Sequence, residues 1–460
     1  MSRKRNHHTG LKIFLILLML LLLAGTGLMI KMSLELTNAE PETTPAETVT
    51  LPRPALPSES VETTAAAIPE PEFTASTATI GAMGDLLMHK PIFDNKTEYN
   101  AAVQQPDGSY DFTSVFQYLT EYTAALDYAA INLETTLAGE DNGYPYAGYP
   151  LFNCPDAIVD GVKAAGFDMV LTANNHSCDT GIAGYKRTLE VIREKGLETL
   201  GTYASAEETK WTIQEINGIH VGMLCYTWAL SVTEDGRPSL NGTLAIPEAG
   251  ICNYFYSGNL PAFYDEVEAY LKEMKEAGAE ATVLYIHWGN EYVLTANEEQ
   301  QAIAQALCDL GIDVIIGGHP HVIQPIELLE STRDPSHKTV CLYSTGNAVS
   351  NQRKGNLKAI KTAHTEDGLL FSVTFEKNEE GEVSLSRVNA LPTWVNMHTN
   401  SDGRTEYNIL PLDYSRVEEW ADLFDIDEST LHAAKDSYNR TMDIITEGLA
   451  DVQEYLEQNP

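Results

Sequence analysis

The sequence predicts an α/β fold built around a largely parallel β-sheet. Short apolar runs such as DMVLTA and ATVLYIHW alternate with longer segments of helical periodicity such as GIAGYKRTLEVIREKG. Alternation of this kind is typical of parallel strands that are connected through helices. At 460 residues the chain is long enough for one large domain with extensions, or for roughly two or three domains.

The N-terminal segment predicts a membrane anchor. Residues 13–30 form an uncharged apolar run that is long enough to cross a bilayer as a helix. Residues 1–12 contain the basic Arg3, Lys4 and Arg5, which indicates that this end stays in the cytoplasm. A cleaved signal peptide is the alternative, although no A-x-A-like site follows the run. In both cases we expect the main domain to be extracytoplasmic, and the anchor predicts a single-pass protein of the cell membrane.

Residues 31–76 predict a disordered or extended stalk. Most of this segment consists of Pro, Thr, Ala, Glu and Ser, as in AEPETTPAETVTLPRPALPSESVETT. A segment with so few apolar residues cannot bury enough surface to fold by itself.

The globular domain is predicted over residues 77–395, and its elements follow in alternation. It begins with the strand TATIGAMGD and ends with LLFSVTFEK and VSLSRVNALP, which predict a hairpin. The intervening strands are YAAINLE, DMVLTA, IHVGMLCYTW, ATVLYIHW, DVIIGGHPH and KTVCLYSTGN, and the helices are DAIVDGVKAAGF, GIAGYKRTLEVIREKG, LPAFYDEVEAYLKEMKEAG and EEQQAIAQALCDLG. Residues 396–460 form an acidic C-terminal extension with one helix predicted over about 429–456.

Composition excludes some classes of function. The net charge of −37 argues against nucleic-acid binding, which needs a basic face. An anionic substrate would need local positive charge, and a bound metal ion is one source of it. The six cysteines contain no C-x-x-C pair, so neither a thiol redox motif nor a zinc ribbon is indicated. Buried free cysteines and disulfides both remain open for Cys154, Cys178, Cys225, Cys252, Cys308 and Cys341.

Polar residues that commonly ligate metals follow five of the predicted strands. Parallel strands of one sheet share a carboxyl edge, so we expect the five clusters to converge there. Oxygen and imidazole ligands together suit Zn, Mn, Fe or Ni better than Ca or Mg. The residues are, in strand order, Asp85 and His89; Glu134; Asn174, Asn175, His176 and Asp179; His287 and Glu291; His319 and His321.

Each cluster also has an ordinary structural interpretation. Gly-Asp after a strand is usually a turn, NLE is a helix cap or surface charge, NNH is an Asx turn, and HWG is a packed aromatic corner. GGHPH is the most specific, because Pro320 separates two histidines in a rigid fork. Five such clusters at five strand ends favour a metal site over five independent turns.

The series GDLLMH, NLE, NNHSCDTG, HWGNEY and GGHPHVIQP resembles the capsule-synthesis CapA family, also called the poly-gamma-glutamate synthesis family. That family is similar to the calcineurin-like metallophosphoesterases, and the likeness covers about residues 77–395. The resemblance implies a metallophosphoesterase-like α/β/β/α sandwich with a centre for two divalent metal ions, of which Mn, Fe and Zn are the candidates.

The resemblance also implies a role for each site residue. His176 would be the general acid for the leaving group, and Glu134 would bridge the two metals. Asp85 and His321 would bind the first metal; Asn175, His287 and His319 would bind the second. His89, Asn174, Asp179 and Glu291 would lie beside the substrate or support the ligands.

Two positions depart from the superfamily pattern. Leu87 stands where an Asp-x-His motif usually has its histidine, and Glu134 stands where the bridging residue is usually Asp. The first metal is therefore expected to lack one ligand unless His89 reaches it.

We expect a membrane-anchored CapA-like protein of capsule, poly-gamma-glutamate or other cell-surface polymer biosynthesis, with a metal-dependent phosphoesterase-type site. The alternative is a non-catalytic, metal-dependent polymer-binding or scaffold subunit of a synthesis or export complex, which Leu87 favours. The expected partners are the cytoplasmic membrane, an anionic polymer or phosphoester substrate, and proteins of polymer synthesis or export.

Overall fold

The computed structural model describes residues 76–94, 99–140, 143–242, 245–356, 358 and 360–459. The predicted cytoplasmic segment, anchor and stalk lie outside these residues, apart from Ser76, which begins the first strand. No helix in the described part of the chain combines the length and the apolar character that crossing a membrane would require. The described residues cluster as one compact unit.

The first sheet is mixed and has the strand order β17-β16-β15-β1-β2-β3-β4, with β14 paired to β1 beyond this path. Strands β1 to β4 are parallel to one another, and β15 is antiparallel to β1. The strands are β1 (Ser76–Leu86), β2 (Tyr128–Leu133), β3 (Met169–Leu171), β4 (Glu198–Leu200), β14 (Asn347–Val349), β15 (Asp367–Lys377), β16 (Val383–Thr399) and β17 (Thr405–Pro411).

The second sheet has the order β12-β13-β11-β10-β6-β5, with β9 paired to β6. Its four central strands are parallel, while the edge strands β5 and β12 are antiparallel to their neighbours. The strands are β5 (Thr212–Ile216), β6 (Ile219–Trp228), β9 (Tyr254–Phe255), β10 (Ala281–His287), β11 (Val314–Gly318), β12 (Ile323–Glu330) and β13 (Lys338–Thr345). A separate two-stranded sheet consists of β7 (Ser231–Val232) and β8 (Pro238–Ser239).

The expectation that all five polar clusters lie on one sheet edge is therefore wrong. β1, β2 and β3 belong to the first sheet, whereas β10 and β11 belong to the second. Strands of both sheets are apolar on two faces, so the pattern of residues does not reveal which strands pair. The clusters still meet, because the two sheets pack against each other and contribute to one site.

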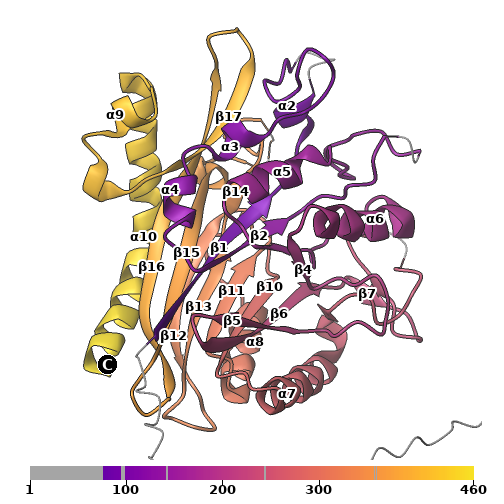
Figure 1. Cartoon of the computed structure of the whole chain (residues 1–460), viewed down its shortest axis with the longest axis vertical. Helices are drawn as coiled ribbons and strands as arrows, with labels where there is room; N and C mark the ends of the chain where they lie inside the picture. The colour runs from indigo at the N-terminus through magenta and orange to yellow at the C-terminus, as the bar shows by residue number, and fades with distance from the viewer. Residues whose placement is uncertain are drawn as a thin grey trace, which may run out of the picture. The chain divides into compact units, whose positions relative to one another are not determined.

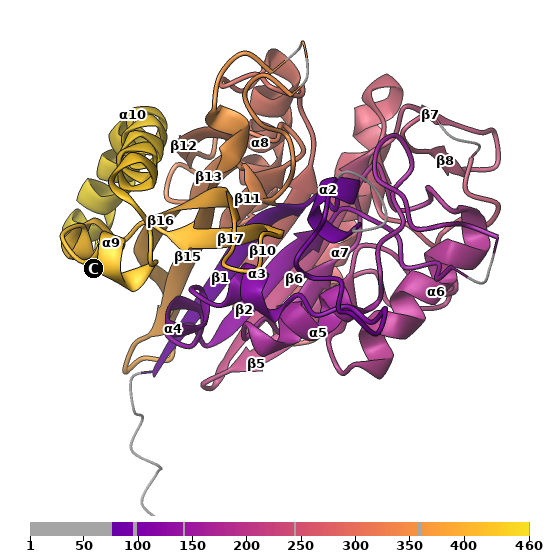
Figure 2. The ribbon, with the colours of Figure 1, turned by 90° about the horizontal axis from the view of Figure 1, so that it is seen from above.

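Helices cover the outer faces of both sheets, as Figures 1 and 2 show. The helices are α2 (Lys90–Phe93), α3 (Thr113–Phe116), α4 (Thr120–Thr123), α5 (Ala157–Ala164), α6 (Gly181–Glu194), α7 (Leu260–Glu276), α8 (Glu298–Leu310), α9 (Trp420–Leu423) and α10 (Glu428–Gln458), with 3-10 turns η1 (Ser257–Asn259), η2 (His364–Glu366) and η3 (Tyr414–Arg416).

Three apolar layers hold this arrangement together. Between the sheets, Leu171 and Phe371 of the first pack in one cluster with Met223, Tyr285 and Ile316 of the second. The outer face of the first sheet packs against α5 and α6, and the outer face of the second packs against α7 and α8. The order of layers is therefore helices, sheet, sheet, helices, and burial of these faces is the main stabilising term.

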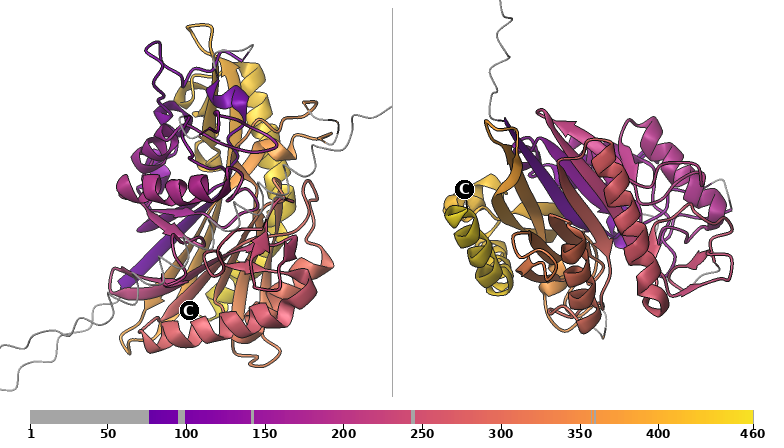
Figure 3. Two further views of the ribbon diagram at one scale, coloured as in Figure 1. Left: turned by 90° about the vertical axis from the view of Figure 1, so that its right-hand side faces the viewer. Right: turned by 90° about the horizontal axis from the view of Figure 1, so that it is seen from below.

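The C-terminal residues complete this unit. The predicted hairpin is confirmed, because β15 and β16 pair in antiparallel fashion. β16 continues past residue 395 to Thr399, and β17 extends the same sheet. α10 packs on β12 of the second sheet and β16 of the first, on one side of the strands (Figure 3). Ile445 and Val452 of α10 are fully buried in the cluster between the sheets, so this helix closes one side of the core.

Candidate metal centre

The ends of five strands deliver the predicted ligands to one place. Asp85 is the penultimate residue of β1, and Glu134 directly follows β2. His287 ends β10, and the fork of His319 and His321 follows β11. Asn175 and His176 lie in the loop after β3. Every one of these side chains is buried, with His319 the most exposed at 8%.

Asp85, Glu134 and His321 form one group of possible ligand atoms. Oδ2 of Asp85 lies 3.1 Å from Nδ1 of His321, and Asn132 donates a hydrogen bond to Oδ1 over 2.7 Å. Burial raises the pKa of Asp85, but the hydrogen bond from His321 and the charge of His287 outweigh it and lower the pKa to about 2. Asp85 is therefore an anion at neutral pH, as a metal ligand must be.

Glu134, His287 and His319 form the second group. Nε2 of His287 lies 3.5 Å from Oε1 of Glu134, 3.2 Å from Nδ1 of His319 and 2.9 Å from Oδ1 of Asn175. Burial and the neighbouring His287 lower the pKa of His319 well below its usual range. His319 is therefore neutral, which leaves a ring nitrogen able to bind a metal.

Glu134 belongs to both groups and is fully buried. Neither of its carboxylate oxygens accepts a hydrogen bond within the described part of the chain. Nitrogens of His176, His287 and His321 lie 3.5 to 3.9 Å from Oε1. Burying a carboxylate without close partners is costly, so these residues fit a divalent cation between Glu134 and the imidazoles.

His321 provides positive charge beside the two buried carboxylates. Burial lowers its pKa, but Glu134 and Asp85 outweigh burial and raise the pKa to about 9. In the metal-free centre a proton on His321 therefore supplies part of the positive charge that these two carboxylates require.

The fork has an unusual backbone. His319 has a φ of +94° and His321 a φ of +56°, in the left-handed region that residues with a Cβ rarely adopt. A Cβ added to Gly317 would lie 2.0 Å from the carbonyl oxygen of Tyr343, so β11 and β13 require a glycine here. Strain of this kind is typical of functional sites, where the surrounding structure holds it in place.

His176 is positioned differently from the other histidines. Its Nδ1 lies 2.6 Å from Oδ2 of Asp179, and its ring packs edge-on against Phe152 at 4.6 Å between centroids. The Asn241 side-chain amide also reaches Nδ1, over 3.1 Å. Nδ1 is therefore engaged by Asp179, and Nε2 is left facing Glu134 at 3.9 Å.

The remaining predicted residues surround this centre. Asn174 bonds the backbone of Leu133 and the side chain of Asn132, which fixes the loop after β3. Nδ1 of His89 lies 3.1 Å from the carbonyl oxygen of Leu87 and accepts a hydrogen bond from the Asn351 N–H, and His89 is in neither ligand group. Burial and the charge of His321 lower the pKa of His89 to about 4. Glu291 is exposed at the surface, in the loop that follows β10.

The sequence did not reveal three asparagines that contact residues of the site. Asn132 bonds Asp85, Oδ1 of Asn347 lies 3.1 Å from Nδ1 of His321, and Asn241 contacts His176. Asn132 precedes Glu134 by two residues, so on an extended strand both face the same side. Asn347 follows the apolar run TVCLYST, which makes it a sixth polar strand end. Asn241 has no comparable signal in the sequence.

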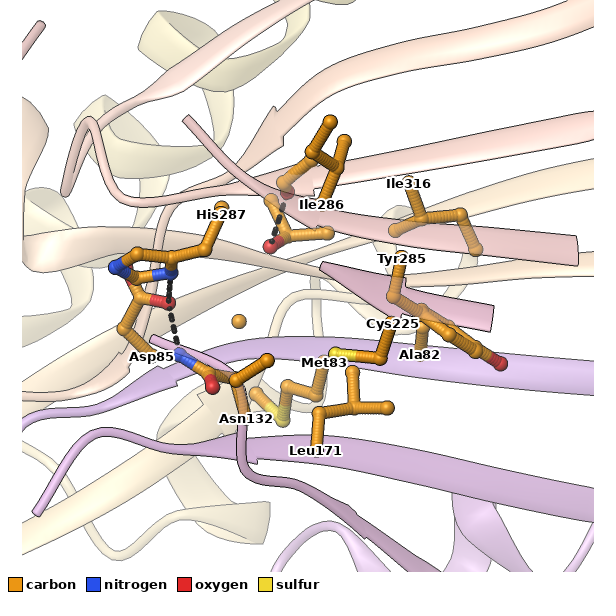
Figure 4. Close-up of a pocket in the computed structure, with 15 residues that line it drawn as sticks. Ala82, Met83, Asp85, Asn132, Leu171, Cys225, Tyr285, Ile286, His287 and Ile316 are labelled. Carbon is orange, nitrogen blue, oxygen red and sulfur yellow. Dashed lines mark hydrogen bonds and ion pairs between the residues drawn. The ribbon is translucent and has the colours of Figure 1, made fainter. Parts of the chain in front are cut away.

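A cavity of about 20 Å³ lies under Asp85 and His287, between the two sheets (Figure 4). The apolar side chains of Ile286 and Ile316 line it together with Cys225. Its size suits roughly one water molecule, so the interior behind the ligands is closely packed. Figure 4 also shows the Asp85 carboxylate between the His287 ring and the Asn132 amide.

Comparison with known proteins gives the chain a family. The family model described as bacterial capsule synthesis protein PGA_cap matches residues 79–352. The chain is 28% identical to the PGA biosynthesis protein CapA of Bacillus subtilis (strain 168) over 66% of this chain and 70% of that protein. It is 27% identical to the capsule biosynthesis protein CapA of Bacillus anthracis over 60% of each chain.

The comparison with solved structures gives a partial alignment. The NAD nucleotidase NadN of Haemophilus influenzae aligns with a TM-score of 0.42 at 12% identity, over 84% of this chain and 68% of that one. The family match spans all five strand ends of the candidate metal centre, from Asp85 to His321. The chain belongs to the bacterial capsule synthesis protein family PGA_cap.

Proposed function

We propose that this protein is a metal-dependent phosphoester hydrolase that acts in the biosynthesis of a capsule or another cell-surface polymer. The observation that carries the proposal is Glu134, a fully buried carboxylate that lies among three imidazoles and accepts no hydrogen bond from the described residues. The layers of helices and sheets, with ligands from both sheets, support a metallophosphoesterase-like sandwich. The CapA relatives are named for capsule and PGA biosynthesis, which supports the polymer context.

Two groups of possible ligand atoms share Glu134, which supports a centre for two divalent ions. Mn, Fe and Zn would suit the mixture of oxygen and imidazole donors. Asp85 and His321 would hold one ion, His287, His319 and Asn175 would hold the other, and Glu134 would contact both. Bound ions would polarise the ester and lower the pKa of a water molecule toward neutrality.

His176 would act on the leaving group. The Asp179 carboxylate would accept a hydrogen bond from Nδ1–H of His176 and so hold the orientation of the ring. Nε2 then carries the proton that the departing oxygen needs, on the side of Glu134. Phe152 packs against the His176 ring, which limits its rotation and excludes water from one face.

A non-catalytic, metal-dependent polymer-binding subunit is the second candidate. Leu87 favours this candidate, because it stands where the superfamily usually has a histidine ligand. His89 does not replace that ligand, since it bonds to the main chain and is not in the first ligand group. The first ion would then have only the three side chains of that group, which favours weak occupancy.

We further propose that residues 13–30 anchor the protein in the cytoplasmic membrane as a single pass and that residues 31–76 carry the domain outside the cytoplasm. The apolar run and the basic residues before it support this location. Proteins of polymer synthesis or export would be neighbours of such a domain.

Hydrolysis of a generic phosphoester by the purified chain tests the proposal, with metal content measured on the same samples. His176→Ala should lose activity about a hundredfold or more while it keeps its metal, since one positioned acid contributes on that order. His321→Ala should lose both metal and activity. If the parent binds metal and hydrolyses no ester, the polymer-binding alternative replaces the hydrolase.

A further inference from the structure

One segment beside the metal centre departs from the acidic character of the chain. The protein has 66 Asp and Glu residues, yet residues 335–365 contain none. Four of the basic residues in this segment fall within residues 353–361, namely Arg353, Lys354, Lys358 and Lys361. In a chain with a net charge of −37, this is a local patch of opposite sign.

The middle of this segment lies beside the proposed metal centre. β14 pairs with β1 at Asn347 and Asp85, and Asn347 contacts the His321 ring. The backbone N–H of Asn351 donates to Nδ1 of His89 over 3.3 Å. Gln352 donates to the hydroxyl of Tyr292, whose ring lies 6.2 Å from that of His321. These bonds fix the position at which the basic residues leave the centre.

Arg353 has a structural role. Its guanidinium bonds Glu366 over 2.7 Å and the carbonyl oxygen of Val395 over 2.7 Å. Both members of the ion pair are largely buried, which ties the segment to the end of the first sheet. Arg353 is therefore not free to bind an external anion.

The three lysines that follow Arg353 are free to bind an external anion. Lys354, Lys358 and Lys361, called the lysine cluster below, are exposed, and their ammonium groups form no ion pair with a carboxylate of the described residues. The backbone N–H of Lys354 donates to Oε1 of Glu366. The ammonium group of an exposed lysine is a point charge on a flexible side chain. It can bind a carboxylate or a phosphate without requiring a fixed geometry. Three such charges in succession suit a ligand that repeats its negative charge along its length.

We infer that the lysine cluster holds an anionic polymer whose reacting end lies at the metal centre. This inference rests on the proposed function for the position of the reacting end, whereas the binding itself does not depend on turnover. The acidic surface elsewhere repels such a polymer, so the cluster favours one direction of approach. Repeating carboxylates or repeating phosphates would provide the shared chemistry.

The test is polymer binding by the full-length chain in detergent micelles, measured with and without a chelator. The probes are fluorescent polyglutamate, polyphosphate and neutral dextran, together with vesicles that contain an anionic phospholipid. The triple variant Lys354→Gln, Lys358→Gln and Lys361→Gln should bind polyglutamate or polyphosphate about tenfold more weakly at low salt, since exposed charge pairs contribute modestly each. The preferred polymer identifies carboxylate or phosphate as the natural repeat.

The control is a second triple variant, Lys272→Gln, Lys275→Gln and Lys435→Gln, on α7 and α10. It removes the same charge and should bind the polymers as the parent does, and melting curves of both variants should match the parent. The inference is overturned if the lysine-cluster variant binds polyanions as tightly as the parent, if dextran binds equally well, or if only the vesicles bind. Absence of ester hydrolysis with polymer binding intact would remove the hydrolase and the reacting end, and would leave polymer binding by the lysine cluster standing.

Discussion

Glu134 shows at the scale of one residue how the site depends on charge. Its carboxylate is fully buried, belongs to both ligand groups and receives no hydrogen bond within the described residues. An isolated buried charge would be neutralised by a shift in its own protonation or by a partner. Asp85 and His321 are an example of neutralisation by a partner, because the pKa of Asp85 is lowered to about 2 and that of His321 is raised to about 9.

The raised pKa of His321 predicts how the stability of the metal-free protein depends on pH. A histidine with a folded pKa of about 9 and an unfolded pKa of 6.5 stabilises the fold fully below pH 6.5. This contribution of about 3 kcal/mol is lost as the pH rises through 9, because the folded state then releases its extra proton. Denaturant unfolding with chelator between pH 6 and about pH 10 measures it. A free energy of unfolding that stays constant over this window in both the parent and His321→Ala would contradict the assignment.

A second prediction concerns Asp179, which orients His176. Asp179→Asn should slow hydrolysis of esters with poorly acidic leaving groups by about a hundredfold, because the imidazole loses its tautomer and its charge partner. Esters with strongly acidic leaving groups should lose much less, since their departing oxygen needs no proton. The metal content should not change. Equal losses for both kinds of ester would show that Asp179 and His176 do not act on the leaving group.

At the scale of elements, α10 connects the two sheets. It packs on β12 and β16, and Arg440 bonds Asp367 at the start of β15 through two nitrogens, over 2.7 and 2.9 Å. Gly448 lies where the helix meets β12, and a Cβ there would come 1.8 Å from the carbonyl oxygen of Ile326. The contact is with backbone, so the helix itself would have to move.

Gly448→Ala should therefore destabilise the protein, although alanine is the better helix former by about 1 kcal/mol. We expect a loss of about 1 to 3 kcal/mol, in the range that overpacking usually costs. Asn439→Ala on the exposed side of the same helix is the control and should be neutral or slightly stabilising. Chemical denaturation of the two variants compares them. A stabilised Gly448→Ala variant would mean that α10 does not lie this close to β12.

The elements also show what the sequence can predict. Asp85, Glu134, His287, His319 and His321 could be predicted because each follows an apolar run that forms a buried strand. The assignment of these strands to two sheets could not be predicted. β3 and β10 are both buried apolar strands, yet they pair with neighbours in different sheets. Asn241 could not be predicted either, since it reaches His176 from a loop 65 residues away.

On the scale of the whole molecule, a layered unit carries all of the proposed chemistry. The six cysteines, whose pairing the sequence left open, are free and buried in this unit. Burial raises the pKa of Cys225 to about 12, so its thiol is unreactive in the folded protein. The stability of the domain therefore comes from its three apolar layers without disulfides.

The free cysteines lead to a prediction for the intact protein. Its melting temperature should be the same with and without a reducing agent, because no covalent link is lost. Thiol reagents should modify the six cysteines only after denaturant is added. A clear drop in melting temperature on reduction would indicate a disulfide and contradict this arrangement.

The central claim is that Glu134 and the surrounding imidazoles hold divalent metal, and metal stoichiometry tests it most directly. The metal-free parent should take up two ions of Mn, Fe or Zn per chain at equilibrium, measured by elemental analysis after gel filtration. Glu134→Gln should lose one ion or both, whereas Glu276→Gln on the exposed side of α7 should match the parent. Absence of metal in the parent, or equal metal in the parent and Glu134→Gln, would contradict the account.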